Sequence, residues 1–385
     1  MARRLLARRL ALTGCACAAL ALAGCTNASS TSSVSVSGTT LMIFQSIPPG
    51  SLSTETQDIL AAEQLAFKQT GGRVGPFTLR LVRYPGREVS ANARQAIGDK
   101  KTIAYLGEIA PGSSADSLGI TNAEDVLQVS PTDTALELTR QAPTISGTPD
   151  RYYEALSTYG RTFARVVPTD AAEARAVVGE LPALGVKRLY VTSDGTPYGN
   201  ALKHELLSQA KSGLTVASAP SAADAVFYAG SSPSGASAVF NQALSANPKA
   251  KLFAPSALAL GSFASSLSPA AQHNLYISAP GFTAANLPPA AGRFVSAFRA
   301  ANGHDPAPQA IFGYAAMAAV IHAIQRAGSS ANNRSAVVHA FFSIRNLSSV
   351  LGSFSIDKNG DTSIAPFVLE RVKAGALVPT VQLQG

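Results

Sequence analysis

Residues 187–254 decide the fold class, because three short apolar segments there alternate with stretches of helical composition. The segments are Lys187-Arg188-Leu189-Tyr190-Val191, Ala225-Val226-Phe227-Tyr228 and Lys251-Leu252-Phe253-Ala254. Helices are expected between them, over Tyr198–Lys211 and over Ser234–Ala246. A chain that alternates strands with helices predicts a parallel sheet covered by helices on both faces.

The same alternation continues in both directions from this stretch. Further strands are expected over residues 41–44, 77–82, 102–106, 126–129, 163–167 and 275–278. Further helices are expected over residues 54–69, 88–97, 170–184, 291–301 and 308–326, with Thr169 or Asp170 as the cap of the third. The apolar run of the last helix is interrupted by Gly313, Tyr314 and His322, so a buried helix is expected there.

The last part of the chain changes character. Gly352–Ile356 and Ile364–Val372 flank Asp357-Lys358-Asn359-Gly360-Asp361. Asn-Gly supplies the positive φ angles of a tight turn, so the segment predicts a β-hairpin. A calcium loop is not expected, because an EF-hand needs its glycine at position six and a glutamate at position twelve.

The amino-terminal segment has the features of a bacterial lipoprotein signal peptide. Arg3, Arg4, Arg8 and Arg9 precede an apolar stretch that ends in Leu22-Ala23-Gly24-Cys25. We expect residues 1–25 to be the signal peptide and Cys25 to carry the lipid. An ordinary cleaved signal remains open, and Cys15 is less suitable because cleavage there leaves too short an apolar core. Residues 26–40 are mostly Ser, Thr, Ala, Val and Gly, which predicts a flexible tether.

Charge and cysteine content exclude several classes of protein. Without the four signal arginines, the 31 basic residues fall to 27 against 23 acidic ones, and no basic run is present. Nucleic acid is therefore not expected as a partner. All three cysteines lie at or before Cys25, so the rest of the chain contains no disulfide. Its stability must therefore come from its hydrophobic core.

No catalytic or cofactor motif is present. The sequence lacks a phosphate loop, a Gly-x-Ser-x-Gly turn and a His-Glu-x-x-His pair, and its five histidines have no metal-ligand spacing. We therefore expect neither an enzyme nor a metal or cofactor site. Polar residues instead follow strands at residues 107–114 and 130–134, and Asp170 and Tyr198 begin helices. Ligands bind at such strand ends in open parallel sheets, although each hydroxyl is also a plausible helix cap.

The order of these segments resembles type I periplasmic binding proteins, in the branched-chain amino-acid branch that serves ABC importers. The matching segments are Gly71-Gly72-Arg73-Val74-Gly75, Ala104-Tyr105-Leu106-Gly107, Ser130-Pro131-Thr132-Asp133-Thr134, Arg165-Val166-Val167-Pro168-Thr169-Asp170, Tyr198-Gly199, Gly313-Tyr314-Ala315-Ala316 and Gly352–Asp361. The resemblance covers the chain from Leu41 to about Val372. It implies two doubly wound parallel-sheet lobes joined by three hinge crossovers. Lobe one is expected over residues 40–167 and 282–350, and lobe two over 168–281 and 351–385.

The resemblance also implies a ligand site between the lobes. Thr134 matches a hydroxyl and amide donor, Thr132 a backbone contact, Asp170 an acid at the crossover and Tyr198 the aromatic residue of lobe two. The full expected set is Ile109, Ala110, Pro111, Thr132, Asp133, Thr134, Asp170, Tyr198, Ser231 and Ser256.

Two positions depart from the family pattern. Pro111 stands where a serine is usual and offers neither a hydroxyl nor an N–H group. Ser256 stands where an acid usually contacts the ligand ammonium, and losing such a partner costs about 1.5–3 kcal/mol. Glu108 or Asp133 is expected to supply a substitute charge, or the ligand is less zwitterionic than an amino acid.

The sequence therefore predicts a monomeric, lipid-anchored, extracytoplasmic solute-binding protein. Its expected partners are a small-molecule ligand, an ABC permease and the membrane that holds its anchor. A degenerate, non-transporting lipoprotein of the same fold, acting as a sensor or an interaction module, is the alternative that Pro111 and Ser256 motivate. A hydrolytic enzyme is the third and weakest hypothesis, since it lacks a catalytic motif.

Overall fold

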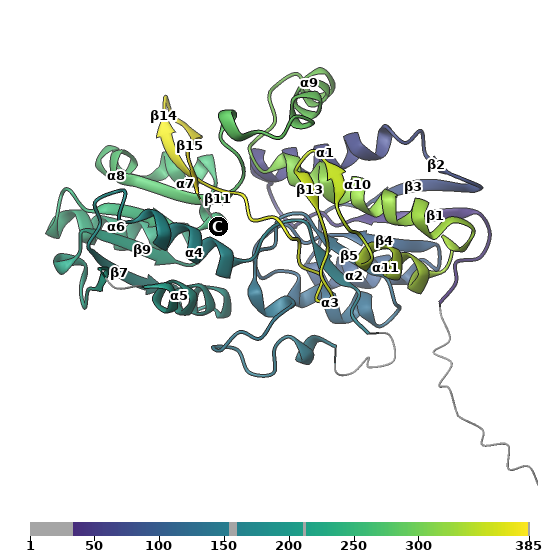
Figure 1. Cartoon of the computed structure of the whole chain (residues 1–385), viewed down its shortest axis with the longest axis horizontal. Coiled ribbons are helices and arrows are strands. Elements are labelled where there is room, and N and C mark those ends of the chain that lie inside the picture. Colours follow the sequence, from purple (N-terminus) through teal and green to yellow (C-terminus); the bar gives the residue numbers. More distant parts are fainter. Residues whose placement is uncertain (1–33, 154–159, 211–212, 384–385) are drawn as a thin grey trace, which may run out of the picture. The chain divides into compact units, whose positions relative to one another are not determined.

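The computed structural model describes residues 34–153, 160–210 and 213–383. The predicted signal peptide, Cys25 and most of the predicted tether lie outside these residues. Within them, the chain forms two separate mixed sheets, each dominated by parallel strands, and a small two-stranded sheet. This α/β architecture confirms the predicted fold class (Figure 1).

The first sheet has the strand order β2-β3-β1-β4-β5-β6. All its neighbouring strands are parallel except β2 with β3. Their bounds are β1 Thr40–Gln45, β2 Arg73–Val74, β3 Phe77–Arg83, β4 Thr102–Leu106, β5 Leu127–Ser130 and β6 Phe163–Arg165. Parallel pairing directs the carboxyl ends of β4 and β5 to the same edge of the sheet, where their polar loops begin.

The second sheet has the strand order β15-β14-β11-β10-β9-β7-β8. Strands β7 to β11 are parallel, and β14 and β15 add antiparallel strands beside β11, although they are far away in sequence (Figure 1). The bounds are β7 Arg188–Ser193, β8 Thr215–Val216, β9 Ala225–Ala229, β10 Lys251–Ala254, β11 Leu275–Pro280, β14 Phe367–Lys373 and β15 Ala376–Leu383.

Helices connect most of the strands, close to the predicted positions. They are α1 Thr54–Lys68, α2 Val89–Gly98, α3 Ala115–Asn122, α4 Asp170–Glu180, α5 Pro197–Gln209, α6 Pro233–Ala246, α7 Gly261–Ser266, α8 Pro269–Asn274, α9 Ala291–Asn302, α10 Ala310–Ala327 and α11 Arg334–Phe342. The predicted cap of α4 is confirmed as Thr169, whose hydroxyl accepts a hydrogen bond from the Ala172 N–H at 3.3 Å.

Helix α10 belongs to the hydrophobic core around the first sheet. The stretch Ala310–Ser330 is apolar and long enough to cross a membrane, but 67% of an 18-residue window within it is buried in the protein. Gly313 allows α10 to approach α1, because a Cβ atom at this position would lie 2.4 Å from the Ile59 carbonyl oxygen. The expectation of a buried helix is therefore confirmed.

The predicted hairpin around Asn359-Gly360 is wrong. Ile356 and Thr362 form only an isolated bridge. Strand β13 (Gly352–Phe354) pairs with β12 (Leu347–Ser349), and β14 pairs with β11 and β15. The turn instead packs on β6, where the Gly360 carbonyl accepts the Arg165 N–H at 2.9 Å. A Cβ atom at residue 360 would lie 2.2 Å from the Phe163 carbonyl oxygen, so this close approach needs glycine.

The last residues of the predicted tether pack against the core around the first sheet. The tether is therefore shorter than the sequence predicted. Val36 is 1% exposed, and its N–H donates to the Asn332 carbonyl at 2.7 Å. The Arg334 N–H donates to the Val34 carbonyl at 3.0 Å. A buried valine and a short backbone pairing hold residues 34–36, which composition alone did not indicate.

The hairpin of β12 and β13 also bears on the proposed lobe boundaries. Leu351, Phe354 and Ile356 are buried in the same cluster as the first sheet and α10. Phe367 and Leu369 of β14 belong to a cluster around the second sheet. We therefore propose that the last crossover follows Ile364, rather than residue 350 as the sequence suggested.

Candidate functional site

Thr134 and Asp170 bring together two of the predicted site segments. Thr134 lies in the loop after β5, and Asp170 is the first residue of α4. The Asp170 N–H donates to the Thr134 carbonyl oxygen at 2.8 Å, and both residues are fully buried. The Thr134 hydroxyl and both Asp170 carboxylate oxygens have no hydrogen-bond partner among the described residues. Buried polar atoms are rarely left in this state, which makes the pair a ligand-site candidate.

Glu137 adds a third acceptor that sequence reasoning missed. It lies in the short 3₁₀ helix Leu136–Leu138, is 3% exposed, and its Oε2 atom also has no partner in the described part of the chain. Burial raises the pKa of Glu137. Burial and the charge of Glu137 together raise the pKa of Asp170 well above its ordinary value. The Asp170 N–H also bonds the carbonyl of Thr134, three residues before Glu137, which joins the two segments.

Glu173 is the second buried acid that the sequence prediction did not include, and its carboxylate contacts Ser256. Its carboxylate accepts the Ser256 N–H at 2.8 Å, the Ser256 hydroxyl at 2.9 Å and the Ser278 hydroxyl at 2.5 Å. Complete burial raises the pKa of Glu173 to about 7, although these three hydrogen bonds oppose the shift. Glu173 is three residues after Asp170 on α4, so helical spacing places the two acids on one face. That spacing was the signal available in the sequence.

Tyr198 carries the remaining unpartnered group. It lies in the first turn of α5, is 5% exposed, and its hydroxyl has no hydrogen-bond partner among the described residues. Burial, followed by the charges of Glu173 and Asp170, raises its pKa well above the ordinary value, while the Ser256 side chain opposes this shift. A Cβ atom on Gly112 would lie 3.6 Å from the Tyr198 Cβ atom, so the loop after β4 reaches this side chain too.

The Asp133 carboxylate holds the loops together through backbone N–H groups and is not available to pair with a ligand. Its carboxylate accepts the N–H groups of Gly112 at 2.6 Å, Ser114 at 2.8 Å and Ala135 at 3.1 Å. The substitute charge expected from Asp133 is therefore committed to backbone donors. Glu108 is committed as well, since it accepts bonds from Tyr105 at 2.6 Å and Ser46 at 2.7 Å. The free acids are Asp170 and Glu137.

The other predicted residues of the first loops shape the backbone. The Thr132 hydroxyl donates to the Ile109 carbonyl at 2.7 Å, and the Ala110 carbonyl accepts the Ser113 hydroxyl at 2.5 Å. Ile109 and Pro111 are half-buried, whereas Ala110 is exposed. These contacts join the loop after β4 to the loop after β5 and hold Thr134 beside α4.

Ser231 is not joined to the other predicted residues by any contact within the described ranges. It is exposed, and its N–H donates to an Asp194 carboxylate oxygen at 2.8 Å. Both residues line a separate cavity of about 440 Å³ with Thr196. The structure thus brings together Thr134, Asp170, Tyr198 and Ser256 but leaves Ser231 apart.

Arg165 is a buried cation whose charge acts on these acids, and its donors are occupied. It is fully buried and pairs with Asp361 at 2.9 Å. It also donates to the carbonyl oxygens of Asp133 at 3.0 Å and Ala135 at 2.7 Å, and to the Thr139 hydroxyl. Arg165 therefore fixes the loop that carries Thr134, while its own charge is matched by Asp361.

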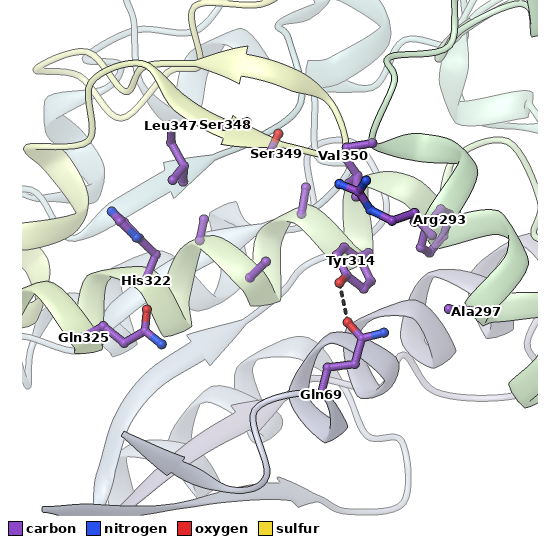
Figure 2. Close-up of a pocket in the computed structure, with 15 residues that line it drawn as sticks. Gln69, Arg293, Ala297, Tyr314, His322, Gln325, Leu347, Ser348, Ser349 and Val350 are labelled. Atoms are coloured by element: carbon purple, nitrogen blue, oxygen red, sulfur yellow. Dashed lines mark hydrogen bonds between the residues drawn. The ribbon is translucent and has the colours of Figure 1, made fainter. Parts of the chain in front are cut away.

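A larger cavity of about 600 Å³ lies elsewhere, between α9, α10 and β12. Figure 2 shows Tyr314 pointing toward Gln69, and the Tyr314 hydroxyl donates to the Gln69 side-chain oxygen. His322 also lines this cavity, and burial lowers its pKa. None of the unpartnered buried side-chain atoms of the described residues belongs to its lining, so the cavity presents no comparable polar site.

The comparisons with solved structures agree on one fold. A leucine-binding protein from Thermotoga maritima superposes with a TM-score of 0.72 and 21% identity, over 90% of this chain and 99% of that one. The branched-chain amino-acid transporter substrate-binding protein of Streptococcus pneumoniae, in complex with isoleucine, gives 0.69 and 16% over 90% and 99%. The fold is that of the type I periplasmic binding proteins.

Two further comparisons concern the periplasmic binding protein family, one through its sequence model and one through another solved structure. The family's sequence model matches residues 216–376. A solute-binding protein from R. palustris in complex with benzoate also has this fold, with a TM-score of 0.65 and 16% identity over 90% of this chain and 96% of that one. No curated protein matches the chain. The predicted resemblance to this family is confirmed.

Proposed function

We propose that the chain is a lipid-anchored, extracytoplasmic solute-binding protein that captures an amino acid or a related small metabolite for an ABC importer. One observation carries the proposal. Five buried side-chain atoms on Thr134, Glu137, Asp170 and Tyr198 have no hydrogen-bond partner among the described residues, and the Asp170 N–H joins α4 to the loop of Thr134. Leaving such groups unpaired costs about 1–3 kcal/mol each, and a bound solute would supply the partners.

The placement of these residues supports capture between two halves of the molecule. Thr134 follows β5 of the first sheet, whereas Tyr198 follows β7 and Ser256 follows β10 of the second. Ligand bound among them contacts both sheets, so binding favours the arrangement in which the halves are close. The names of the leucine-binding, isoleucine-bound and benzoate-bound neighbours are consistent with a small solute.

Thermal unfolding against a panel of amino acids, amines and small carboxylic acids tests the proposal. A ligand at a hundred times its Kd adds about 2.7 kcal/mol of stability. The rise should be lost in Asp170→Asn and retained in Asp305→Asn, a matched control at an exposed ion pair with Arg299. If no member of the panel raises the melting temperature of the native sequence, solute capture is contradicted.

A sensor or interaction module of the same fold remains the second candidate, because Pro111 still offers neither N–H nor hydroxyl. It predicts ligand binding without uptake, whereas the importer role predicts that deleting the gene abolishes uptake of the ligand.

The anchor has its own test. Cys25→Ser should move the protein from the membrane fraction to the soluble extracytoplasmic fraction. Continued membrane association of this variant contradicts lipidation at Cys25.

A further inference from the structure

The site holds more hydrogen-bond acceptors than donors. Among the described side chains, and with both acids ionised, Asp170 and Glu137 present three carboxylate oxygens without partners, whereas the side-chain donors of the site without a partner are the hydroxyls of Thr134 and Tyr198. Glu173 adds a third buried carboxyl group next to Tyr198. A ligand that satisfies this set must therefore donate hydrogen bonds more than accept them.

The charge of the site points the same way. The positive charge of Arg165 acts on both Glu137 and Asp170. Its guanidinium already serves Asp361, Thr139 and two backbone carbonyls. Isolated buried carboxylates are very unfavourable, so a ligand with net positive charge stabilises the site and a zwitterion leaves the excess acid unmatched.

Two backbone donors in the loop after β4 are already used. In the loop after β4, the N–H groups of Gly112 and Ser114 both donate to the Asp133 carboxylate, at 2.6 and 2.8 Å. The neighbouring Pro111 has no N–H group. An internal carboxylate thus occupies two amide donors of this loop and leaves them unable to bind a ligand carboxylate.

A bound metal ion is a poor alternative occupant. Within residues 34–153, 160–210 and 213–383, no group of three or more His, Cys, Asp or Glu side chains is arranged to hold one. Glu173 also keeps its oxygens on Ser256 and Ser278.

We propose that the site takes a cationic amine without a free carboxylate, such as a primary amine or an amino-acid amide, whose ammonium group binds between Asp170 and Glu137. This inference rests on the proposed function and narrows its substrate class. Asp170, Glu137 and the Asp133-occupied loop then set specificity by charge.

Two matched ligand series test this directly by isothermal titration calorimetry. The first is leucinamide, leucine and 4-methylpentanoate, and the second is phenylalaninamide, phenylalanine and 3-phenylpropanoate. Within each series the apolar part is constant and the charge changes from cation to zwitterion to anion. A pH of about 6.5 keeps the amines charged, since an α-amino group has a pKa of about 7.7–8.0.

The amide should bind at least ten-fold more tightly than its amino acid in the series that fits, and the carboxylic acid should not bind. Asp170→Asn should weaken amide binding by ten-fold or more, while Asp305→Asn should leave it unchanged. Tighter binding of the amino acid or the carboxylic acid overturns this inference but leaves solute capture intact. Absence of binding by every compound, including the wider panel, overturns both.

Discussion

The Glu173 carboxylate accepts hydrogen bonds from both the backbone N–H and the hydroxyl of Ser256, at 2.8 and 2.9 Å. The family pattern places an acid at the position of Ser256, and here the acid comes from α4 instead. The two residues are separated by 83 positions in sequence. Glu173 therefore places a buried carboxyl group beside Ser256, in the segment that follows β10.

Introducing the family's acid at residue 256 should destabilise the protein, because two carboxyl groups then share one buried position. We expect Ser256→Asp to lower the free energy of unfolding by more than 2 kcal/mol, and Glu173→Ala in the same chain to restore part of it. Urea unfolding of the single and double variants measures this coupling. Ser262→Asp, at an exposed position of α7, is the control. Additive effects of the two changes would show that the residues do not share one position.

Removing the Thr134 hydroxyl should stabilise the ligand-free protein while weakening ligand binding. The hydroxyl is buried without a described partner, so Thr134→Val removes an unsatisfied group at nearly constant shape and should raise unfolding stability by up to about 1 kcal/mol. The matched control is Thr121→Val, since the Thr121 hydroxyl bonds Gln128 at 2.6 Å and its loss should be destabilising. Calorimetric unfolding checks both. Equal destabilisation by the two variants would mean that the Thr134 hydroxyl has an internal partner.

The ligand-free protein should lose stability as the pH rises from about 5 to about 8. Burial raises the pKa of Glu63 and Glu370 to about 8 and that of Glu108 and Glu173 to about 7. The folded state then holds protons that the unfolded chain releases near pH 4.5, so stability falls as the pH rises through this window.

Glu370→Gln isolates one contribution to this pH dependence. Its stability profile should be flatter than that of the native sequence between pH 5 and 8, because glutamine does not titrate. The exposed Glu88→Gln is the control and should leave the profile unchanged. Unfolding in urea at several pH values measures it, and an identical slope for Glu370→Gln and the native sequence contradicts the assignment.

Asp361 should be among the most costly single residues to remove. It pairs with the fully buried Arg165 and with Arg140, at 2.9 and 2.6 Å. Breaking a buried pair leaves an uncompensated charge and costs about 3–5 kcal/mol, so Asp361→Asn should lower unfolding stability by that order. Asp305→Asn breaks an exposed ion pair and should cost about 1 kcal/mol or less.

The ion pair of Asp361 with Arg165 should also change how the unfolding stability depends on pH in acid. Burial opposes ionisation of Asp361, but Arg165, Thr139 and Arg140 hold its pKa below the ordinary value. The stability it contributes is present above about pH 4 and is lost as the pH falls further. Asp361→Asn should remove this acid-side loss, and a native-like acid limb in the variant would contradict the role of the pair.

The sequence predicted the strands and most helices because their signals are local. Apolar runs such as 225–228, the cap at Thr169 and the loops at strand ends all act within a few residues. The prediction of a hairpin at Asn359-Gly360 was wrong because the turn binds Arg165, which is far away in sequence. The Arg165 N–H bonds the Gly360 carbonyl, and its guanidinium pairs with Asp361. The ordered Val36 was missed because its partner Asn332 is nearly three hundred residues away.

The candidate site was predicted only in part for the same reason. Thr134, Asp170 and Tyr198 follow from their places at strand ends and helix starts. The commitment of Asp133 and Glu108 to internal donors depends on folded geometry, as does the approach of Glu173 to Ser256. Glu137 lacks a motif altogether, and only its burial beside Asp170 identifies it.

Solute capture at Asp170 is best tested by a crystal structure of the protein with its tightest ligand from the amine and amino-acid panel. The ligand should lie among Thr134, Glu137, Asp170 and Tyr198, with its nitrogen about 2.7–3.2 Å from an Asp170 carboxylate oxygen. Ligand bound instead in the cavity beside Tyr314 and His322, with the Asp170 oxygens still without a partner, would contradict it.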